Sequence, residues 1–231
     1  MNDYQTQSEQ FRLRAEEVLE QSALADIWRQ AGCRVNIVGS MRMNLMALHR
    51  DIDLHVYSQG ITIENSFAVA SRMAADPRVK EIRCINGLHT DEHCVAWHVT
   101  FEADDNKLWQ FDIIHIESGT TYDGFFEQMA DRILSNATDE QKSTILQLKF
   151  ETPASEEIHG VEYYEAVIAD GIRTLPALRT WLIDHRAKTP YYWMPEGNIS
   201  EYKVAASGSG FSGRSDYPWS AENPGWRGGI R

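Results

Sequence analysis

The sequence lacks any long apolar run. None of its segments approaches the roughly 20 consecutive apolar residues that a membrane-spanning helix needs. Residues 1–21 are polar and contain no apolar stretch of the kind that forms the core of a signal peptide. With 42% hydrophobic and 24% charged residues, the composition is that of a soluble globular protein. We therefore expect a cytoplasmic protein that does not associate with membranes.

Cysteine is scarce as well. The chain has three, Cys33, Cys84 and Cys94, and none of them belongs to a CxxC pair. An odd number without metal-type spacing argues against a disulfide framework or a zinc site. Each cysteine lies among apolar residues, so we expect buried free thiols.

Positive charge is in deficit. The chain has 22 Lys and Arg residues against 34 Asp and Glu residues, a formal net charge of −12. A protein that grips phosphate backbones over a broad surface needs the opposite balance, so nucleic acid is not an expected partner. Nucleotides stay open, because a bound divalent cation supplies positive charge locally. A cationic small molecule or a polypeptide fits this charge better than a nucleic acid does.

The apolar pattern predicts an α+β fold for residues 1–120, a mixed β-sheet with helices packed against it. The expected helices cover residues 5–31, 41–48 and 61–77, and the expected strands cover residues 34–38, 51–57, 79–89, 93–103 and 107–116. Residues 104–106, Asp-Asp-Asn, separate the last two strands and are typical of a hairpin turn.

The remaining chain has a different character. Residues 121–188 predict a small helical subdomain, with helical patterns over residues 122–137, 139–151 and 160–185. Residues 189–231 are rich in Gly, Ser, Pro, Trp and Tyr and predict an irregular tail. Its aromatic residues are too many to be left in water, so we expect them to pack on the domain or on a second copy of the chain, forming a homodimer in the latter case.

Two aspartates occur one residue apart in the second expected strand. This strand alternates apolar residues with polar ones: Ile52, Leu54 and Val56 against Asp51, Asp53 and His55. Because strand residues two apart share one face, both aspartates project from the same side. Carboxylates arranged in this way can share metal ions about 3.5–4 Å apart, the separation found in two-metal phosphoryl-transfer sites. Oxygen ligands of this kind suit Mg²⁺.

Two further sequence features are typical of a phosphoryl-transfer site and would complete the one suggested by these aspartates. Gly39 and Ser40 end the first expected strand and precede a short helix, where backbone N–H groups and a hydroxyl can approach phosphate oxygens. Asp112 lies inside an apolar strand, where a lone acid is costly to bury unless it is paired or bound to metal. Asp112 is therefore the best candidate for a third carboxylate.

The sequence Gly39-Ser40, a spacer, Asp51-Ile52-Asp53-Leu54 and the later strand residue Asp112 resembles the nucleotidyltransferase superfamily typified by DNA polymerase β, whose pattern is hG[GS], Dh[DE]h and h[DE]h. The resemblance covers about residues 30–116. The helical part that follows is similar, more loosely, to the helical appendage of small bacterial members.

The resemblance implies a metal-dependent transfer of a nucleoside monophosphate. Asp51 and Asp53 would hold two Mg²⁺ ions, for which Mn²⁺ could substitute. Asp112 would bind the ion nearer the acceptor and help to activate its hydroxyl. Ser40 and the backbone of Gly39 would hold the triphosphate of an NTP such as ATP, and pyrophosphate would leave. Catalysis would then depend mostly on positioning and charge neutralisation.

Several other polar side chains admit two interpretations. Arg42 and Arg50 flank the short helix, and either could reach a phosphate; we assign Arg42 to the nucleotide, while Arg50 is as well placed to pair with an acid. Lys149 and Arg173 could contact the triphosphate. Charged residues on helices are usually solvated, however, so we expect both side chains to be in water. His55 could orient a metal-bound carboxylate or be purely structural.

Two rival functions remain. One is a non-catalytic module that binds a nucleotide or a partner protein, for example as the antitoxin-like half of a two-protein system; the presence of all three carboxylates argues against such a decayed site. The other is a metal-dependent phosphohydrolase on a different fold, which the Gly-Ser spacing does not support. The sequence leaves the acceptor open, whether a small-molecule or a protein hydroxyl, and it leaves open which NTP is used.

Overall fold

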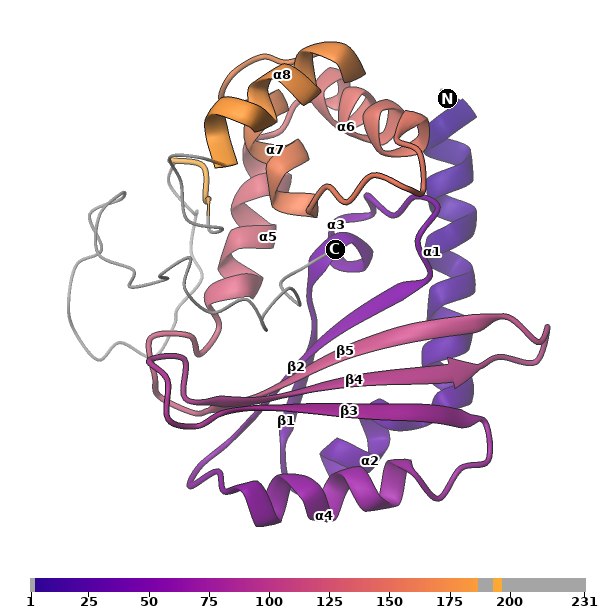
Figure 1. Ribbon diagram of the computed structural model, residues 1–231, viewed down its shortest axis with the longest axis vertical. Coiled ribbons are helices and arrows are strands. Elements are labelled where there is room, and N and C mark those ends of the chain that lie inside the picture. The colour runs from indigo at the N-terminus through magenta and orange to yellow at the C-terminus, as the bar shows by residue number, and fades with distance from the viewer. Residues whose placement is uncertain (1–2, 187–192, 197–231) are drawn as a thin grey trace.

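A five-stranded mixed sheet lies at the centre of the computed structural model, which describes residues 3–186 and 193–196 (Figure 1). The strands are β1 (Arg34–Ile37), β2 (Asp51–Ser58), β3 (Val79–Gly87), β4 (Cys94–Glu102) and β5 (Leu108–Glu117). Their order is β1-β2-β5-β4-β3; β2 and β5 are parallel, and the other neighbours are antiparallel. The predicted α+β class is confirmed, and so is the hairpin between β4 and β5.

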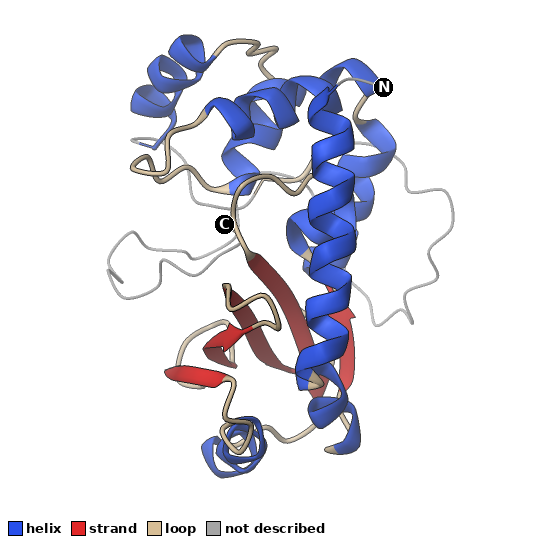
Figure 2. Ribbon diagram, turned by 90° about the vertical axis from the view of Figure 1, so that its right-hand side faces the viewer, coloured by secondary structure: helices blue, strands red, loops and turns tan. Residues whose placement is uncertain are grey.

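Helices lie on both faces of this sheet. They are α1 (Asp3–Ser22), α2 (Leu24–Gln30), α3 (Gly39–Met43), α4 (Ile63–Met73), α5 (Phe125–Asn136), α6 (Asp139–Glu151), α7 (Gly160–Ile168) and α8 (Leu175–Arg186). In Figure 1, α2 and α4 lie below the sheet and α5–α8 above it. Figure 2 shows α1 running from the layer of α5–α8 down to α2. None of the described helices combines the length and apolarity that crossing a membrane requires.

Two apolar cores form on opposite faces of the sheet. The core on the side of α2 and α4 contains Ile52, Leu54, Val56, Trp28 and Met73. The core on the side of α5–α8 contains Ile114, Ile116, Ile133, Leu148, Val167 and Leu178. The predicted alternation of β2 is therefore confirmed. Because the second core draws on sheet and helices alike, the helical part buries its apolar surface against the sheet; a domain boundary near residue 120 stays a prediction.

The prediction of one helix over residues 5–31 is wrong. The chain breaks between α1 and α2 at Ala23, which adopts a left-handed conformation with φ of 53°. Ser22 stabilises the break, because its hydroxyl donates to the carbonyl of Leu19 over 2.9 Å and accepts from the backbone N–H of Leu24 over 3.3 Å. The turn directs α2 under the sheet, where Trp28 is fully buried.

Two other expected helices differ from the structure. The short helix begins at Gly39 and ends at Met43, since Asn44 is left-handed with φ of 53°; the expected range was 41–48. The pattern over residues 160–185 forms two helices, α7 and α8, separated by a turn at Gly171 with φ of 68°. Most of the predicted tail, residues 189–192 and 197–231, lies outside the described residues, but Trp193 and Met194 pack against the core.

The cysteine prediction is confirmed in its main point. All three thiols are free, and Cys33 and Cys94 are buried, whereas Cys84 is only half-buried.

His115 on β5 makes the stability of the fold depend on pH. Its ring is buried, with Nε2 2.8 Å from the Ser58 hydroxyl and Nδ1 3.1 Å from that of Ser66. Burial lowers the pKa of His115 to about 4. As the pH falls below about 6.5, the unfolded chain binds a proton that the folded chain resists, so the free energy of unfolding falls, by about 2 kcal/mol at pH 5.

We expect the His115→Gln variant to lose this part of the pH dependence. The measurement is urea unfolding of both proteins at pH 7 and pH 5. Burial also lowers the pKa of His55, to about 3, and that contribution stays in both proteins. Equal changes of stability between the two pH values in wild type and variant would contradict the assignment to His115.

Candidate functional site

The parallel pairing of β2 with β5 brings the three predicted carboxylates together. In the register of these strands Asp53 lies opposite Asp112, and Asp51 lies opposite Gln110. Neighbouring strands are about 4.8 Å apart, so the carboxylates share one small area of the sheet. All three are buried, with exposed fractions of 6% for Asp51, 4% for Asp53 and 5% for Asp112.

Gly39 packs directly on Asp53. The backbone N–H of Val38 donates to the carbonyl of Asp53 over 3.1 Å, which ties the start of α3 to β2. Gly39 follows with φ of 64°, a conformation that favours glycine. A Cβ atom at this position would lie 2.9 Å from Cγ of Asp53 and closer still to one of its oxygens. The glycine therefore leaves room for the carboxylate, and the buried Ser40 follows it at the same site.

The carboxylate of Asp53 is in an electrostatically costly position. Burial raises its pKa well above the usual range, and the neighbouring Asp51 and Asp112 raise it further, while Lys149 acts in the opposite direction. Its Oδ2 atom is buried and has no hydrogen-bond partner among the described residues. A buried carboxylate oxygen of this kind is normally compensated by a hydrogen bond or a cation.

These residues fit a hard divalent cation by the chemistry of their donors. Three adjacent carboxylates, one with an uncompensated oxygen, are the ligands that Mg²⁺ prefers. The side chains do not already surround a common point: in the described residues, no group of three or more His, Cys, Asp and Glu side chains is arranged to hold a metal ion.

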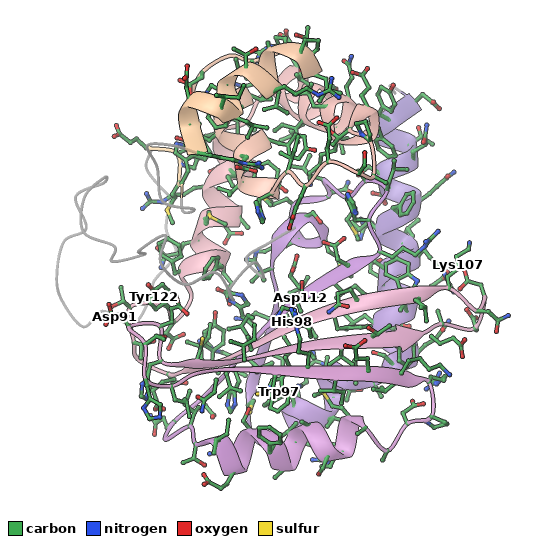
Figure 3. All side chains as sticks on the ribbon, in the orientation of Figure 1. Asp91, Trp97, His98, Lys107, Asp112 and Tyr122 are labelled. Atoms are coloured by element: carbon green, nitrogen blue, oxygen red, sulfur yellow. The ribbon has the colours of Figure 1, made fainter. Side chains whose placement is uncertain are left out.

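Asp112 is held from the side of β4. His98 Nδ1 lies 2.5 Å from Asp112 Oδ1, and Gln110 Nε2 donates to the same oxygen over 3.1 Å. Figure 3 shows His98 and Asp112 next to each other on the sheet. Sequence patterns did not reveal this contact, because it depends on the register between β4 and β5.

Lys149 of α6 reaches the site from the helical part. Its Nζ donates to the carbonyl of Leu45 over 2.9 Å and to the hydroxyl of Tyr164 over 3.1 Å. Burial lowers the pKa of Lys149 to about 8, and Asp51 and Asp53 oppose this shift. The expectation that Lys149 is a solvated surface lysine is therefore wrong. The sequence did hold a sign of its burial, because Lys149 follows the buried Ile145 by four residues and so lies on the apolar face of the helix.

The arginines considered from the sequence have other partners or remain at the surface. The guanidinium of Arg42 binds both carboxylate oxygens of Asp131 on α5, from Nε and Nη2 over 3.0 Å each. Its assignment to the nucleotide stays a prediction. Arg50 is exposed, and Arg173 donates to the backbone carbonyls of Val167 and Ile172.

His55 occupies a structural position. It is buried on the same face of β2 as the aspartates, and its ring packs edge-on against Phe126 with centroids 4.7 Å apart. Nδ1 lies 3.4 Å from the hydroxyl of Tyr57. Its low pKa keeps the ring neutral at physiological pH. This is the behaviour of a core histidine.

No protein-family model matches the sequence, and no curated protein matches it either. Solved structures do. A chain of the poly(A) polymerase complex GLD-2–GLD-3 is 11% identical with a TM-score of 0.47, over 78% of this chain and 64% of that one. A chain of the GLD-2/RNP-8 complex is 11% identical with a TM-score of 0.48, over 85% and 77%. Cid1, with RNA terminal uridylyl transferase activity, is 12% identical with a TM-score of 0.45, over 72% and 52%.

This chain therefore spans about two thirds of the first of these structures and about half of the third. At this identity, the likeness concerns the course of the backbone alone.

Proposed function

We propose that the protein is a metal-dependent nucleotidyltransferase. It transfers a nucleoside monophosphate from an NTP to a hydroxyl of a small molecule or a protein. The acceptor oxygen bonds to the α-phosphorus, the bond from that phosphorus to the bridging oxygen breaks, and pyrophosphate leaves. The observation that carries the proposal is the register of Asp53 with Asp112 beneath Gly39, with a buried oxygen of Asp53 that has no partner in the described part of the chain.

In this proposal the carboxylates of Asp51, Asp53 and Asp112 hold Mg²⁺ or Mn²⁺. When bound, these cations neutralise the triphosphate and the charge that develops during transfer. The chain itself does the positioning. Gly39 leaves room for the carboxylate of Asp53, and Ser40 together with the backbone of Gly39 would hold the triphosphate. Asp112 would bind the cation nearer the acceptor and so help to activate the acceptor's hydroxyl.

The test is a nucleotide-transfer assay with the full-length protein. Each of the four NTPs is supplied with Mg²⁺ and a panel of hydroxylated small molecules and proteins. Pyrophosphate release is followed together with the mass of the acceptor. Release that depends on an acceptor, with a mass increase of one nucleoside monophosphate, would support the proposal. Nucleotide binding without release over the whole panel would favour a binding module, and acceptor-independent release of phosphate would favour a phosphohydrolase.

Lys149 is expected to contribute to triphosphate binding. Its ammonium group lies on the helical side of the site, where Asp51 and Asp53 act on its charge. A charge-assisted hydrogen bond contributes about 1.5–3 kcal/mol, so Lys149→Met should raise KM for the NTP about 10- to 100-fold. Steady-state kinetics at saturating Mg²⁺ measures this.

The matched control is Lys142→Met on the same helix. Lys142 is half-buried and pairs only loosely with Asp139, at 4.0 Å, so its loss should leave KM unchanged. Since Lys149 also binds the carbonyl of Leu45, thermal unfolding of both variants separates loss of packing from loss of binding. An unchanged KM in Lys149→Met would remove Lys149 from the binding site.

A further inference from the structure

Four polar side chains stand in register across four strands of the sheet. Asp53 on β2 pairs with Asp112 on β5, Asp112 pairs with His98 on β4, and His98 pairs with Arg83 on the edge strand β3. Register partners in a sheet project to the same face at intervals of about 4.8 Å. The row of polar residues therefore extends from the three carboxylates to His98, which has no role in the proposed mechanism.

The contact between His98 and Asp112 is short and buried. Nδ1 and Oδ1 are 2.5 Å apart, and His98 is only 8% exposed. As a metal ligand Asp112 would be a carboxylate, which only accepts hydrogen bonds, so the imidazole would donate from Nδ1. His98 Nε2 is buried as well and has no hydrogen-bond partner among the described residues. Within residues 3–186 and 193–196, the one hydrogen bond of this ring is thus directed at Asp112.

This contact determines how the carboxylate is turned. The terminal torsion of an aspartate has broad minima, so the group rotates easily unless it is held. His98 and Gln110 both bind Oδ1, and neither of them binds Oδ2. Partners of this kind fix the orientation of metal ligands, and their loss costs about 10- to 100-fold in metal affinity or activity.

We propose that His98 is a positioning residue for Asp112. Its Nδ1–H holds Oδ1 and so keeps Oδ2 available for the cation that Asp112 shares with Asp53. The inference rests on the proposed function, because it assumes that Asp112 is a metal ligand. His98 itself touches neither the cation nor the nucleotide.

Two substitutions separate this role from a merely structural one. The amide nitrogen of Asn is bonded to Cγ, like Nδ1 of histidine, so His98→Asn keeps a donor for Asp112. His98→Leu keeps the volume but removes the donor. Mn²⁺ affinity, measured by electron paramagnetic resonance without nucleotide, should fall about 10- to 100-fold in His98→Leu and stay within about threefold of wild type in His98→Asn. If His98→Leu does not fold, His98→Met, which also has no N–H donor, takes its place.

Kinetics supplies a second readout. The Mg²⁺ concentration for half-maximal turnover should rise in His98→Leu by the same factor as the loss of Mn²⁺ affinity, with KM for the NTP unchanged at saturating Mg²⁺. His115→Gln is the matched control. It alters a different buried histidine, which lies on β5 and has the hydroxyls of Ser58 and Ser66 as its own partners. It should leave Mn²⁺ affinity unchanged.

The outcomes distinguish this inference from the proposed function. Wild-type binding of Mn²⁺ that is lost in Asp51→Asn but unchanged in His98→Leu overturns the role of His98 and leaves the function standing. Equal losses in His98→Leu and His98→Asn also overturn it, since the donor would then be irrelevant. If the wild-type protein binds no Mn²⁺, with or without an NTP, the proposed function fails and this inference fails with it.

Discussion

Replacing Asp53 by Asn should abolish nucleotide transfer and, at the same time, stabilise the cation-free fold. The carboxylate is buried next to Asp51 and Asp112, and these neighbours add to the cost of its charge. Asn has nearly the same shape without that charge, so the repulsion disappears. Without the carboxylate the cation loses a ligand, and the several kcal/mol of charge stabilisation that a metal supplies correspond to a rate loss of at least about 100-fold.

The two effects are measured separately. Pyrophosphate release in the presence of the best acceptor gives the rate, and thermal unfolding in EDTA gives the stability, with an expected rise in Tm of about 3 °C for a relief of about 1 kcal/mol. Asp76→Asn is the contrasting variant. Asp76 accepts hydrogen bonds from Arg78, which lower its pKa, so its charge stabilises the fold and its loss should lower Tm. An Asp53→Asn protein that turns over at the wild-type rate would refute the proposed function.

Among the glycine substitutions, Gly39→Ala should cause the largest loss of stability and activity. A comparison with Gly60→Ala identifies the cause. Both glycines have φ of 64°, so alanine meets the same backbone strain at either position, about 1–2 kcal/mol. Around Gly60 a Cβ atom would meet nothing within 4 Å, whereas at Gly39 it would overlap the carboxylate of Asp53. The difference between the two variants therefore isolates the cost of displacing Asp53.

We expect Gly60→Ala to lose about 1–2 kcal/mol of stability with normal activity. Gly39→Ala should lose about 2–5 kcal/mol, since overpacking adds to the strain, and its activity should fall at least about 100-fold. Urea unfolding and the transfer assay measure these quantities. The double variant Gly39→Ala/Asp53→Ala should recover part of the stability and none of the activity, because the clash is gone together with the ligand. Equal losses of stability in Gly39→Ala and Gly60→Ala would show that the carboxylate moves aside without cost.

The parts of the site that follow from local patterns were predictable. The alternation of Ile52 and Leu54 with the aspartates determines which face of β2 is polar, and the strand-turn-helix at Gly39 lies within the same stretch of chain. Asp112 could be selected because burying a carboxylate in an apolar strand is costly unless the carboxylate is paired or binds a metal ion. Each of these signals spans only a few residues, and periodicity is the property that a sequence displays directly.

The missed features depend on partners that are far apart in the chain. Arg42 and Asp131 are separated by 89 positions, and Lys149 contacts the carbonyl of Leu45 across 104. No local pattern encodes such pairs. The break at Ala23 was missed for another reason: alanine is the strongest helix former, so its left-handed conformation comes from packing on either side and overrides local propensity.

The order of the strands has a consequence for how the chain folds. Among the described strands, the last to be synthesised is β5, and it occupies the central position of the sheet, between β2 and β4. A nascent chain that has reached β4 can form hairpins but cannot join its two halves, so closure of the sheet waits for contacts of long sequence separation, which form slowly. The same insertion delivers Asp112 to Asp53. The step that completes the sheet is therefore also the step that assembles the carboxylates. A ribosome-bound fragment ending before β5 would have neither the complete sheet nor the carboxylate site.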